Sequence, residues 1–449
     1  MNSVVLERLE TDKTNKLLYE YSIPAITGTL VVALYNLIDS IYIGHGPGLG
    51  DHAIGGLGII LPIMTLLSAI GSLVGTGAAA RISIYLGMND KSKAADVLMN
   101  AVLLIVLFTG CFVFFVYMFM EPVLFLIGST ADTHPFARDF LLFYLPCSVI
   151  LNLNFTLCSA MRASGYPRKS MYVMLLGVVA NILLAPVFIF LLKWGMKGAA
   201  IATSISAFIT LLPIIYHFVG KDATLPFQRK KLAIDSKISR DILSIGSSPF
   251  VIQLAASLVV FFINNRLRIY GDSQAIEAYT IANRLTLVII LVISGLTQGM
   301  QPIVGYNWGA QKMGRVKSTV YHAMKMGIII GVVGLVTGLF FSDEIVTLFN
   351  PTAGLAKESS RALQILVLML PLSGLQMVIS VFFQSIDQPL KATLLSLTRQ
   401  FIFLIPALFL LPLFWGVNGV WASIPVSDFL STVLAVILYV WQMRRLKFQ

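Results

Sequence analysis

The sequence predicts an all-α polytopic membrane protein: twelve transmembrane helices in two six-helix bundles, related by a pseudo-two-fold axis along the membrane normal. Three observations predict it, namely scarce charge, twelve long apolar stretches and a repeat. Of the 449 residues, 57% are hydrophobic and 12% are charged, whereas a soluble domain carries about 25% charged residues. A soluble multidomain enzyme is therefore excluded, because it would expose too much apolar side chain.

The apolar stretches are each long enough to cross the hydrocarbon core, which takes about 20 residues as a helix. Only helices and closed barrels satisfy their backbone hydrogen bonds in lipid, and these stretches do not alternate as strands do. The predicted spans are residues 21–43, 53–75, 97–120, 138–161, 171–192, 198–219, 245–265, 275–298, 320–341, 362–385, 392–414 and 419–442.

The distribution of Lys and Arg predicts the orientation. The tails and the even-numbered connections hold roughly three times as many of them as the odd-numbered connections, which places both termini in the cytoplasm. The net charge of +11 is thus an orientation signal, and we expect no nucleic-acid partner. The predicted parts are a cytoplasmic tail (1–20), an N-lobe (21–219), a cytoplasmic linker (220–244), a C-lobe (245–442) and a second cytoplasmic tail (443–449). The linker and second tail contain Lys221, Arg229, Lys230, Lys231 and Lys447.

The two halves of the chain repeat. A shift of 222 residues pairs Gly77 with Gly299 and Pro167 with Pro389, and a shift of 225 pairs Pro24 with Pro249. Six helices per half mean that both halves enter the membrane from the same side. We therefore expect parallel repeats, with the substrate path between them.

Few acidic residues lie inside the predicted spans, where a charge costs about 2.5–3.5 kcal/mol at the helix centre. Asp39 lies near the outer end of span 21–43, and Asn181 and Thr203 lie at similar depth in spans 171–192 and 198–219. A carboxylate, an amide and a hydroxyl together would bind a proton or Na⁺. The alternative is that Asp39 caps its helix or reaches the outer surface.

In the second half, Asp428 and Arg284 lie at matching depths in spans 419–442 and 275–298. We expect a buried ion pair between them, with either a structural or a coupling role. Arg399 lies nearer the cytoplasmic side and is expected to anchor its helix at the headgroup level.

Several uncharged polar residues in the spans are candidates for lining a wet substrate cavity. The alternative is that they form hydrogen bonds between helices. The candidates are Tyr35, Asn36, Gln253, Asn264, Asn283 and Gln298.

Enzyme and cofactor signatures are absent from the sequence. There is no Gly-x-Ser-x-Gly, no His-Glu-x-x-His and no P-loop, and the three cysteines and five histidines lack metal-ligand spacing. We expect no enzymatic activity, no catalytic residues, no cofactor and no bound metal, apart from Na⁺ at the Asp39 cluster. Without a nucleotide-binding domain, energy would have to come from an ion gradient or from a partner.

Short motifs follow the spans in order between Tyr19 and Arg444. They are Ser22–Pro24, Asn36–Gly44, Arg81–Gly87, Lys91–Ala94, Arg162–Pro167, Asn181–Pro186, Gly195–Thr203, Tyr306–Ala310 and Arg399–Gln400 with Pro406. With these motifs, the chain resembles the multidrug and toxic compound extrusion (MATE) family. The resemblance implies two lobes that rock between outward-open and inward-open states.

The resemblance also implies export of amphipathic organic compounds, often cationic and aromatic, in exchange for inward H⁺ or Na⁺. It favours the inner membrane of a bacterium, where we expect a monomer in contact with membrane lipids. The family's cation site maps onto Asp39, Asn181 and Thr203. Many members carry an aspartate where this chain has Ala185, which weakens the case for Na⁺, whereas a single buried carboxyl group could still carry a proton.

Three other functions stay open from the sequence. The first is a lipid-linked precursor flippase or polysaccharide exporter of the same superfamily, although these tend to have fourteen helices and cationic cavities. The second is an integral-membrane enzyme acting on lipids, which would need several reactive groups at one depth. The third is a scaffold or receptor without ion-dependent flux.

Overall fold

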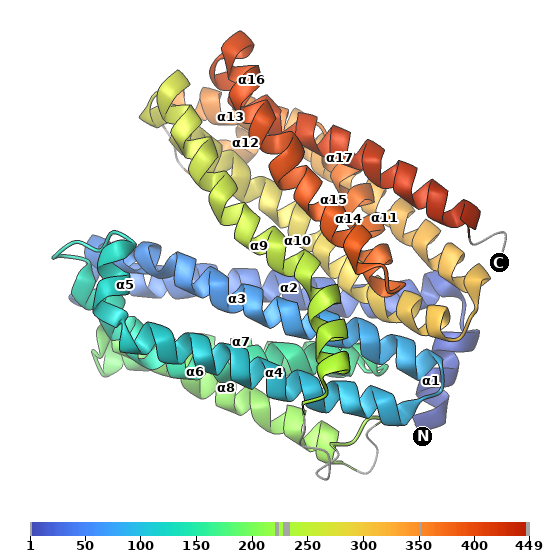
Figure 1. Ribbon diagram of the computed structural model, residues 1–449. Coiled ribbons are helices and arrows are strands. Elements are labelled where there is room, and N and C mark those ends of the chain that lie inside the picture. The colour runs from blue at the N-terminus through green and yellow to red at the C-terminus, as the bar shows by residue number, and fades with distance from the viewer. Residues whose placement is uncertain (1, 221–223, 228–233, 348, 350–351, 446–449) are drawn as a thin grey trace. The chain divides into compact units, whose positions relative to one another are not determined.

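The computed structural model describes residues 2–220, 224–227, 234–347, 349 and 352–445, and all regular structure in these residues is helical (Figure 1). Eleven helices are long and apolar enough to cross a membrane, and one bent helix pair supplies a twelfth crossing. The predicted fold class is therefore confirmed. The helices are α1 (Asn2–Thr11), α2 (Thr14–His45), α3 (Gly50–Gly87), α4 (Lys91–Met118), α5 (Met120–Leu126), α6 (His134–Ala163), α7 (Pro167–Pro186), η1 (Val187–Leu191), α8 (Gly195–Val219), α9 (Ser236–Tyr270), α10 (Ser273–Gly309), α11 (Met313–Phe340), α12 (Ser342–Thr347), α13 (Ala353–Val367), α14 (Leu370–Ser385), α15 (Pro389–Leu397), η2 (Thr398–Leu404), α16 (Ile405–Trp415) and α17 (Val417–Arg445).

Several helices extend well beyond the spans expected from hydropathy. Helix α3 has 38 residues, which is about 57 Å at about 1.5 Å per residue, against a hydrocarbon core of about 30 Å. It ends where Asn89 adopts a left-handed backbone (φ 59°). The Asp90 carboxylate then accepts a hydrogen bond from the Lys93 backbone N–H (3.0 Å) and caps α4.

Three crossings are irregular, and a proline lies at each irregularity. Helices α13 and α14 meet at a 45° bend, where Pro371 lacks a backbone N–H and disfavours helical geometry in the residue before it. The π-helical segments η1 and η2 lie next to Pro186 and Pro406. Pro186 and Pro406 belong to corresponding crossings of the two halves. Each half therefore has a π-helical segment beside a proline in the same crossing.

The connections between helices carry the same repeat. Residues with a left-handed backbone recur at shifts of 221 or 222 positions: Asn89 (φ 59°) with Gln311 (φ 60°), and Gly195 (φ 56°) with Gly416 (φ 54°). Gly165 (φ 101°) and the non-glycine Asp387 (φ 60°) form a third pair. Equivalent turns in the two halves support an ancestral duplication more strongly than matching letters in an apolar sequence.

The chain divides into two compact units. The first comprises Met1–Asp12, Thr27–Phe250 and Gly305–Gln311, and the second comprises Lys13–Ile26, Val251–Val304 and Lys312–Gln449. The division therefore passes through α2, α9 and α10, whereas each predicted lobe comprises six whole predicted spans. The predicted tail, lobe and linker boundaries stay predictions. Lys221, Arg229, Lys230, Lys231 and Lys447 lie outside the described residues.

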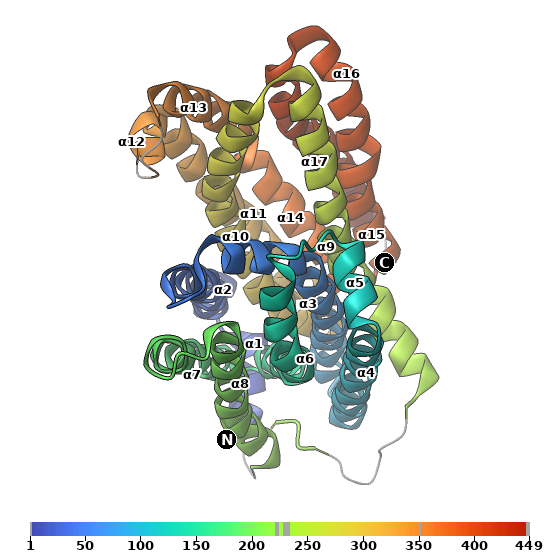
Figure 2. The same ribbon diagram turned by 90° about the vertical axis from the view of Figure 1, so that its left-hand side faces the viewer.

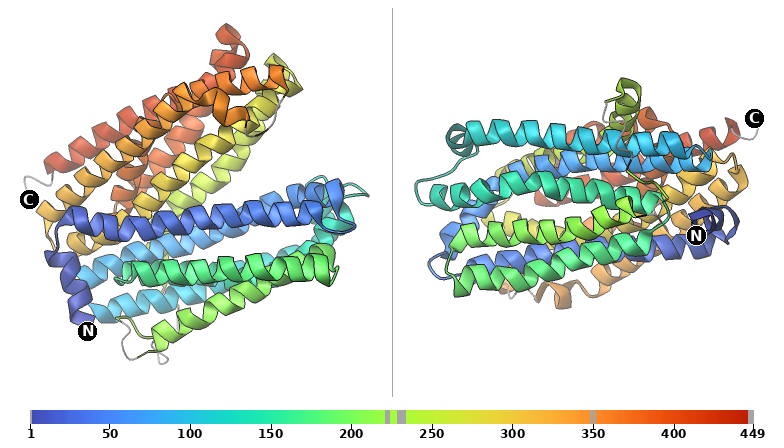
Figure 3. Two further views of the ribbon diagram at one scale, coloured as in Figure 1. Left: turned by 180° about the vertical axis from the view of Figure 1, so that it is seen from behind. Right: turned by 90° about the horizontal axis from the view of Figure 1, so that it is seen from below.

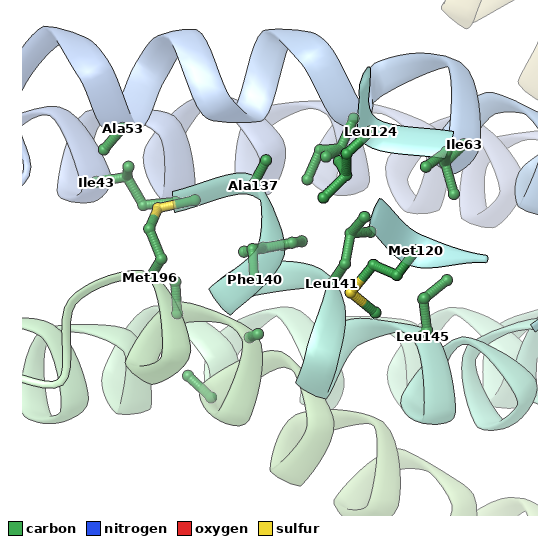
Figure 4. Packing of buried hydrophobic residues seen from close by; sticks show 14 of the residues in the cluster. Ile43, Ala53, Ile63, Met120, Leu124, Ala137, Phe140, Leu141, Leu145 and Met196 are labelled. Atoms are coloured by element: carbon green, nitrogen blue, oxygen red, sulfur yellow. The ribbon is translucent and has the colours of Figure 1, made fainter. Parts of the chain in front are cut away.

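The core of the first unit is built mainly by α3, α6 and α8, with the short helix α5 packed against them (Figure 4). Phe140 and Leu141 of α6 are almost completely buried, and Met120 and Leu124 of α5 pack in the same cluster. Burying a large apolar side chain contributes about 1.5–3 kcal/mol. This cluster therefore fixes α6 and α8, which carry much of the site described below.

The core of the second unit joins α9, α10, α13 and α17. Trp421 of α17 is 1% exposed and packs with Leu363, Leu404 and Leu408. Helix α11 lies against α14 so closely that a methyl group on Gly331 would meet the backbone of Pro371 at the α13–α14 bend. Small residues thus bring helix backbones together, as is common in membrane bundles.

Close glycine contacts also tie the ends of α3, α9 and α10 together in the first unit. A methyl group on Gly77 would meet the carbonyl oxygen of Ile242, and one on Gly246 would meet that of Leu73. The Arg81 guanidinium adds an ion pair to Asp241 of α9 (2.6 Å). These contacts hold the first fifteen residues of α9 on α3.

Helix α2 is the least buried of the crossings. Only 11% of its most apolar window is buried, against 28–56% for the other ten single-helix crossings. From Thr27 onward it runs beside α7, where Gly28 faces Met174 (Figures 2 and 3). The helix that carries Asp39 is therefore held by few neighbours.

Candidate functional site

A cavity of about 230 Å³ lies inside the first unit, between α2, α6, α7 and α8. Most of its wall is apolar, with polar side chains near both ends. Met174 and Asn181 of α7 both line the cavity. They are seven residues apart, so the cavity extends at least about 10 Å along this helix at about 1.5 Å per residue. The lining residues are Val32, Tyr35, Leu151, Asn154, Phe155, Cys158, Arg162, Met174, Gly177, Val178, Asn181, Thr203, Ser206, Ala207 and Thr210.

Thr203 is the centre of a hydrogen-bond network at one end of the cavity. Its Oγ1 donates to the carbonyl oxygen of Ala199 (3.1 Å) and accepts from Asn181 Nδ2 (3.1 Å). The Tyr35 hydroxyl lies 3.3 Å from the same oxygen. Because the only hydroxyl proton of Thr203 is already donated, Tyr35 is the donor in that contact. Thr203 therefore has no further lone pair to offer.

Asp39 lies one helical turn beyond Tyr35 on α2. Its Oδ1 is buried and has no hydrogen-bond partner among the described residues. The carboxyl group is close enough to Tyr35 and Tyr144 to interact with both hydroxyls electrostatically. A buried oxygen without a partner is costly, and such atoms in native proteins usually have a functional reason.

The position of Ala185, where the resemblance implies a second acid in many relatives, is apolar in the structure as well. Ala185 is fully buried one turn beyond Asn181 on α7 and packs in the hydrophobic cluster of the first unit. No group of three or more His, Cys, Asp or Glu side chains that could hold a metal ion occurs in the described part of the chain.

The opposite end of the cavity contains the buried guanidinium of Arg162, a residue that is 7% exposed. It donates to Ser159 Oγ (2.9 Å) and Ser170 Oγ (3.2 Å), and it contacts Met174 Sδ (3.9 Å). Sequence reasoning placed Arg162 in a connection, because hydropathy alone ended the span at residue 161. The helix continues to Ala163, which brings Arg162 into the bundle.

Asn154 is a second cavity residue that sequence reasoning missed. Its Nδ2 donates to the carbonyl oxygen of Ala207 (2.9 Å), while its buried Oδ1 has no partner among the described residues. The signal was available, because Asn154 is a polar residue in the interior of span 138–161. It was indistinguishable there from the neighbouring Asn152, which instead bonds to Leu67 O and Thr109 Oγ1.

In the second unit, the expected pair between Asp428 and Arg284 is wrong. Asp428 Oδ1 accepts from Arg399 Nε (2.7 Å) and Oδ2 accepts from Ser373 Oγ (2.5 Å), while Arg284 is exposed. The expected headgroup anchor at Arg399 is also wrong, since its side chain is only 21% exposed. Equal depth did not bring the two side chains together, because Asp428 faces η2 and α14, whereas Arg284 points to the exposed side of α10.

The remaining cavity candidates are not brought together around the cavity. Tyr35 lines it, whereas Asn36 is exposed on the other side of α2. The other four are half-buried on α9 and α10 of the second unit, and Gln298 Nε2 donates to Ser294 Oγ (3.4 Å) within its own helix. These four are Gln253, Asn264, Asn283 and Gln298.

Comparison with known proteins decides the family. A family model described as MatE matches two stretches of the chain, residues 24–187 and 249–410. The chain belongs to the MatE family. The two stretches correspond to the two halves of the sequence repeat. The resemblance expected from the motifs is confirmed, and the protein is a multi-pass membrane protein of this family.

Relatives and solved structures match over nearly the whole chain. The multidrug export protein MepA of Staphylococcus haemolyticus is 28% identical over 94% of this chain and 92% of its own length. MepA of Staphylococcus aureus strain N315 is 27% identical, over 98% and 96% respectively. The crystal structure of a MATE protein in a bent conformation is 24% identical, with a TM-score of 0.92 over 99% of this chain and 98% of that one. This last likeness establishes the twelve-helix fold.

Proposed function

We propose that this protein is a secondary active exporter in a bacterial inner membrane. It expels amphipathic, often cationic organic compounds in exchange for inward-moving protons, by alternating access between two lobes. Its MatE relatives named multidrug export proteins support the export of small molecules. The observation that carries the proposal is the unpartnered, buried Oδ1 of Asp39 next to the polar end of an intrabundle cavity.

The surroundings of Asp39 support a proton as the coupling ion rather than Na⁺. A dehydrated Na⁺ needs several oxygen ligands, but the Thr203 hydroxyl is saturated by Ala199, Asn181 and Tyr35. The neighbouring Ala185 supplies no oxygen from its side chain. A proton needs only the carboxylate itself, and protonation removes the charge that is expensive in the bilayer.

Competition for Asp39 would couple the two fluxes. Ionised Asp39 attracts a cationic compound into the cavity from the cytoplasmic side, because a buried charge of opposite sign stabilises it. A proton arriving from outside neutralises Asp39 and removes that attraction, so the compound leaves outward. Each ligand shifts the lobe only as far as its affinity differs between the two conformations.

The cavity supports compact apolar ligands with polar groups at their ends. Val32, Leu151 and Phe155 provide the apolar wall, and Tyr35 and Arg162 lie at opposite ends. Such mostly apolar pockets with few polar groups suit small organic ligands. A lipid-linked precursor flippase is less well supported, because Arg162 is the single basic side chain in the lining and a pyrophosphate would favour several.

The test is dye transport by the purified full-length protein in vesicles. A panel of fluorescent organic cations is loaded, and efflux is followed under imposed pH or Na⁺ gradients. We expect efflux driven by the pH gradient and abolished by Asp39→Asn. Asp132→Asn is the matched control, because Asp132 is exposed in the connection before α6 of the same unit.

Two outcomes would contradict the proposal. Undiminished pH-driven efflux by Asp39→Asn would remove Asp39 from the coupling mechanism. Absence of gradient-driven flux of any dye, with export of a lipid-linked anion instead, would favour the flippase. A pure Na⁺ dependence would keep the exporter but replace the coupling ion.

A further inference from the structure

Two backbone irregularities of the second unit meet at one carboxylate, that of Asp428 on α17. The residue is 6% exposed. It lies eleven residues from the start of α17 at Val417, which is about 16 Å along the helix at about 1.5 Å per residue. That depth is close to the middle of a hydrocarbon core about 30 Å thick, where an ionised group must be compensated.

The first irregularity is the π-helical segment η2, which carries Arg399 as its second residue. Arg399 Nε donates to Asp428 Oδ1 (2.7 Å), and Ser427 Oγ donates to the Arg399 backbone carbonyl (2.6 Å). One turn of α17 thus holds both the guanidinium and the backbone of this segment. π-Helical turns inside α-helices are frequent at functional sites.

The second irregularity is the bend between α13 and α14. Ser373, four residues after Met369 at the bend, donates its hydroxyl to Asp428 Oδ2 (2.5 Å). The Thr432 hydroxyl, one turn further along α17, donates to the backbone carbonyl of Asp428 (2.6 Å) and also lies within hydrogen-bond distance of the carbonyl oxygen of Leu372 (3.1 Å). Asp428 is therefore the common partner of a bent helix and a π-helical segment.

Among the residues that the structure describes, Arg399 is the charged side chain paired with this carboxylate. Helices α9 and α10 share the core cluster with α17, but Arg266 stacks on the Phe409 ring, and Arg268, Glu277 and Arg284 are exposed. Helices α14 and α16 carry no Asp, Glu, Lys, Arg or His. The other charges lie toward the helix ends. Lys391 bonds to Gln442 (2.5 Å), and Lys357, Glu358 and Arg361 line a separate pocket with Asn418 and Trp421. Arg444 and Arg445 end α17 itself.

We propose that Asp428, Arg399 and Ser373 form a second proton-binding site of the transporter, separate from Asp39. The proposal rests on the proposed function, proton-coupled export. A proton from water adds to the Asp428 carboxylate, Arg399 keeps its own proton, and the net charge of the cluster changes from zero to +1. The neutral carboxyl group no longer holds the guanidinium, so Arg399 separates from α17.

Protonation of Asp428 leaves the Arg399 guanidinium without its counter-ion. A guanidinium without a counter-ion is expensive in the hydrocarbon region, so the protonated state is favoured only when Arg399 reaches water. Separation of the Arg399 guanidinium removes the side-chain contact between η2 and Asp428 and leaves the Ser427 hydrogen bond to the Arg399 backbone carbonyl as the remaining one, so the π-helical turn is held less firmly. Proton binding at Asp428 is thereby coupled to a rearrangement of two irregular helices in the second unit.

The experiment measures protonation directly, without transport. Infrared difference spectra of the full-length protein in vesicles are recorded between alkaline and acidic pH, and the C=O stretching band of a protonated carboxyl group is followed. We expect one component of this band in the native protein to be lost in Asp428→Asn, while the component from Asp39 remains. Asp343→Asn, at an exposed acid on α12 of the same unit, serves as the control and keeps the band. Identical difference spectra for the native protein and Asp428→Asn would mean that Asp428 does not exchange a proton, and would overturn the proposal.

A second variant keeps the proposal testable if Asp428→Asn fails to fold. Ser373→Ala keeps both charges but removes one hydrogen bond to the Asp428 carboxyl group, so the frequency of its C=O band should shift. An unchanged band would overturn the proposal. Dye transport distinguishes the proposed function from the second proton site. If the native protein shows the Asp428 band but no pH-driven efflux, only the proposed function is contradicted. If it shows efflux but no Asp428 band, only the second proton site is contradicted.

Discussion

Gly87 and Gly309 occupy equivalent places in a reciprocal contact between α3 and α10. A methyl group on Gly87 would meet the carbonyl oxygen of Tyr306, and one on Gly309 would meet that of Ile84. A shift of 222 residues turns Gly87 into Gly309 and Ile84 into Tyr306. The repeat therefore maps each glycine, with the carbonyl group that it faces, onto the other pair. This is the behaviour of a contact that lies on a pseudo-two-fold axis.

Substituting either glycine tests this contact. Gly87→Ala should destabilise the protein, because the added methyl group has only backbone atoms to displace, and overpacking costs about 1–3 kcal/mol. Thermal unfolding of the detergent-purified protein measures the change. Gly110→Ala on α4 is the control, since nothing lies within 4 Å of its added methyl group. Equal melting temperatures for the two variants would mean that α3 and α10 do not meet as closely as described.

Neighbouring valines on α7 test the cavity. Val178 lines it and is 8% exposed, whereas Val179 is 52% exposed on the outside of the bundle. Val178→Phe should fill the cavity and weaken binding of a fluorescent cation at least tenfold, which is about 1.4 kcal/mol. Fluorescence anisotropy in detergent measures the affinity. The same substitution at Val179 should leave affinity unchanged, and equal losses at both positions would place the ligand elsewhere.

The Asn181–Thr203 network and the Asp428 cluster show which features of a site can be predicted from the sequence. Depth along a helix follows from residue counting at a fixed rise, so Asn181 and Thr203 were expected at one level and do form a hydrogen bond. Rotation about the helix and the choice of neighbours do not follow from counting. Asp428 therefore received the wrong partner, Arg284, although the depths matched. Arg399 was harder still, because it lies in η2, and a π-helical turn rotates the following side chains relative to a regular helix.

Thr203 offers a test of the network beside Asp39. Thr203→Ala removes the hydroxyl and leaves the buried Asn181 amide without its partner, a loss of about 1–3 kcal/mol. We expect lower thermal stability and a slower pH-driven efflux. Thr203→Ser retains the hydroxyl and should restore most of both. If Thr203→Ala and Thr203→Ser behave alike, the hydroxyl does not organise this end of the cavity.

The partner of Asp428 is tested by removing each candidate cation in turn. Arg399→Ala leaves a carboxylate that is 8% exposed without its counter-charge, and breaking a buried ion pair from one side typically costs about 3–5 kcal/mol. Arg284→Ala removes an exposed side chain, and such substitutions usually change stability by less than about 0.5 kcal/mol. Chemical denaturation of both variants measures the difference. In the double variant Arg399→Ala with Asp428→Ala, much of the lost stability should return, because no unpaired charge remains buried. A larger loss from Arg284→Ala, or no recovery in the double variant, would contradict the Arg399–Asp428 pair.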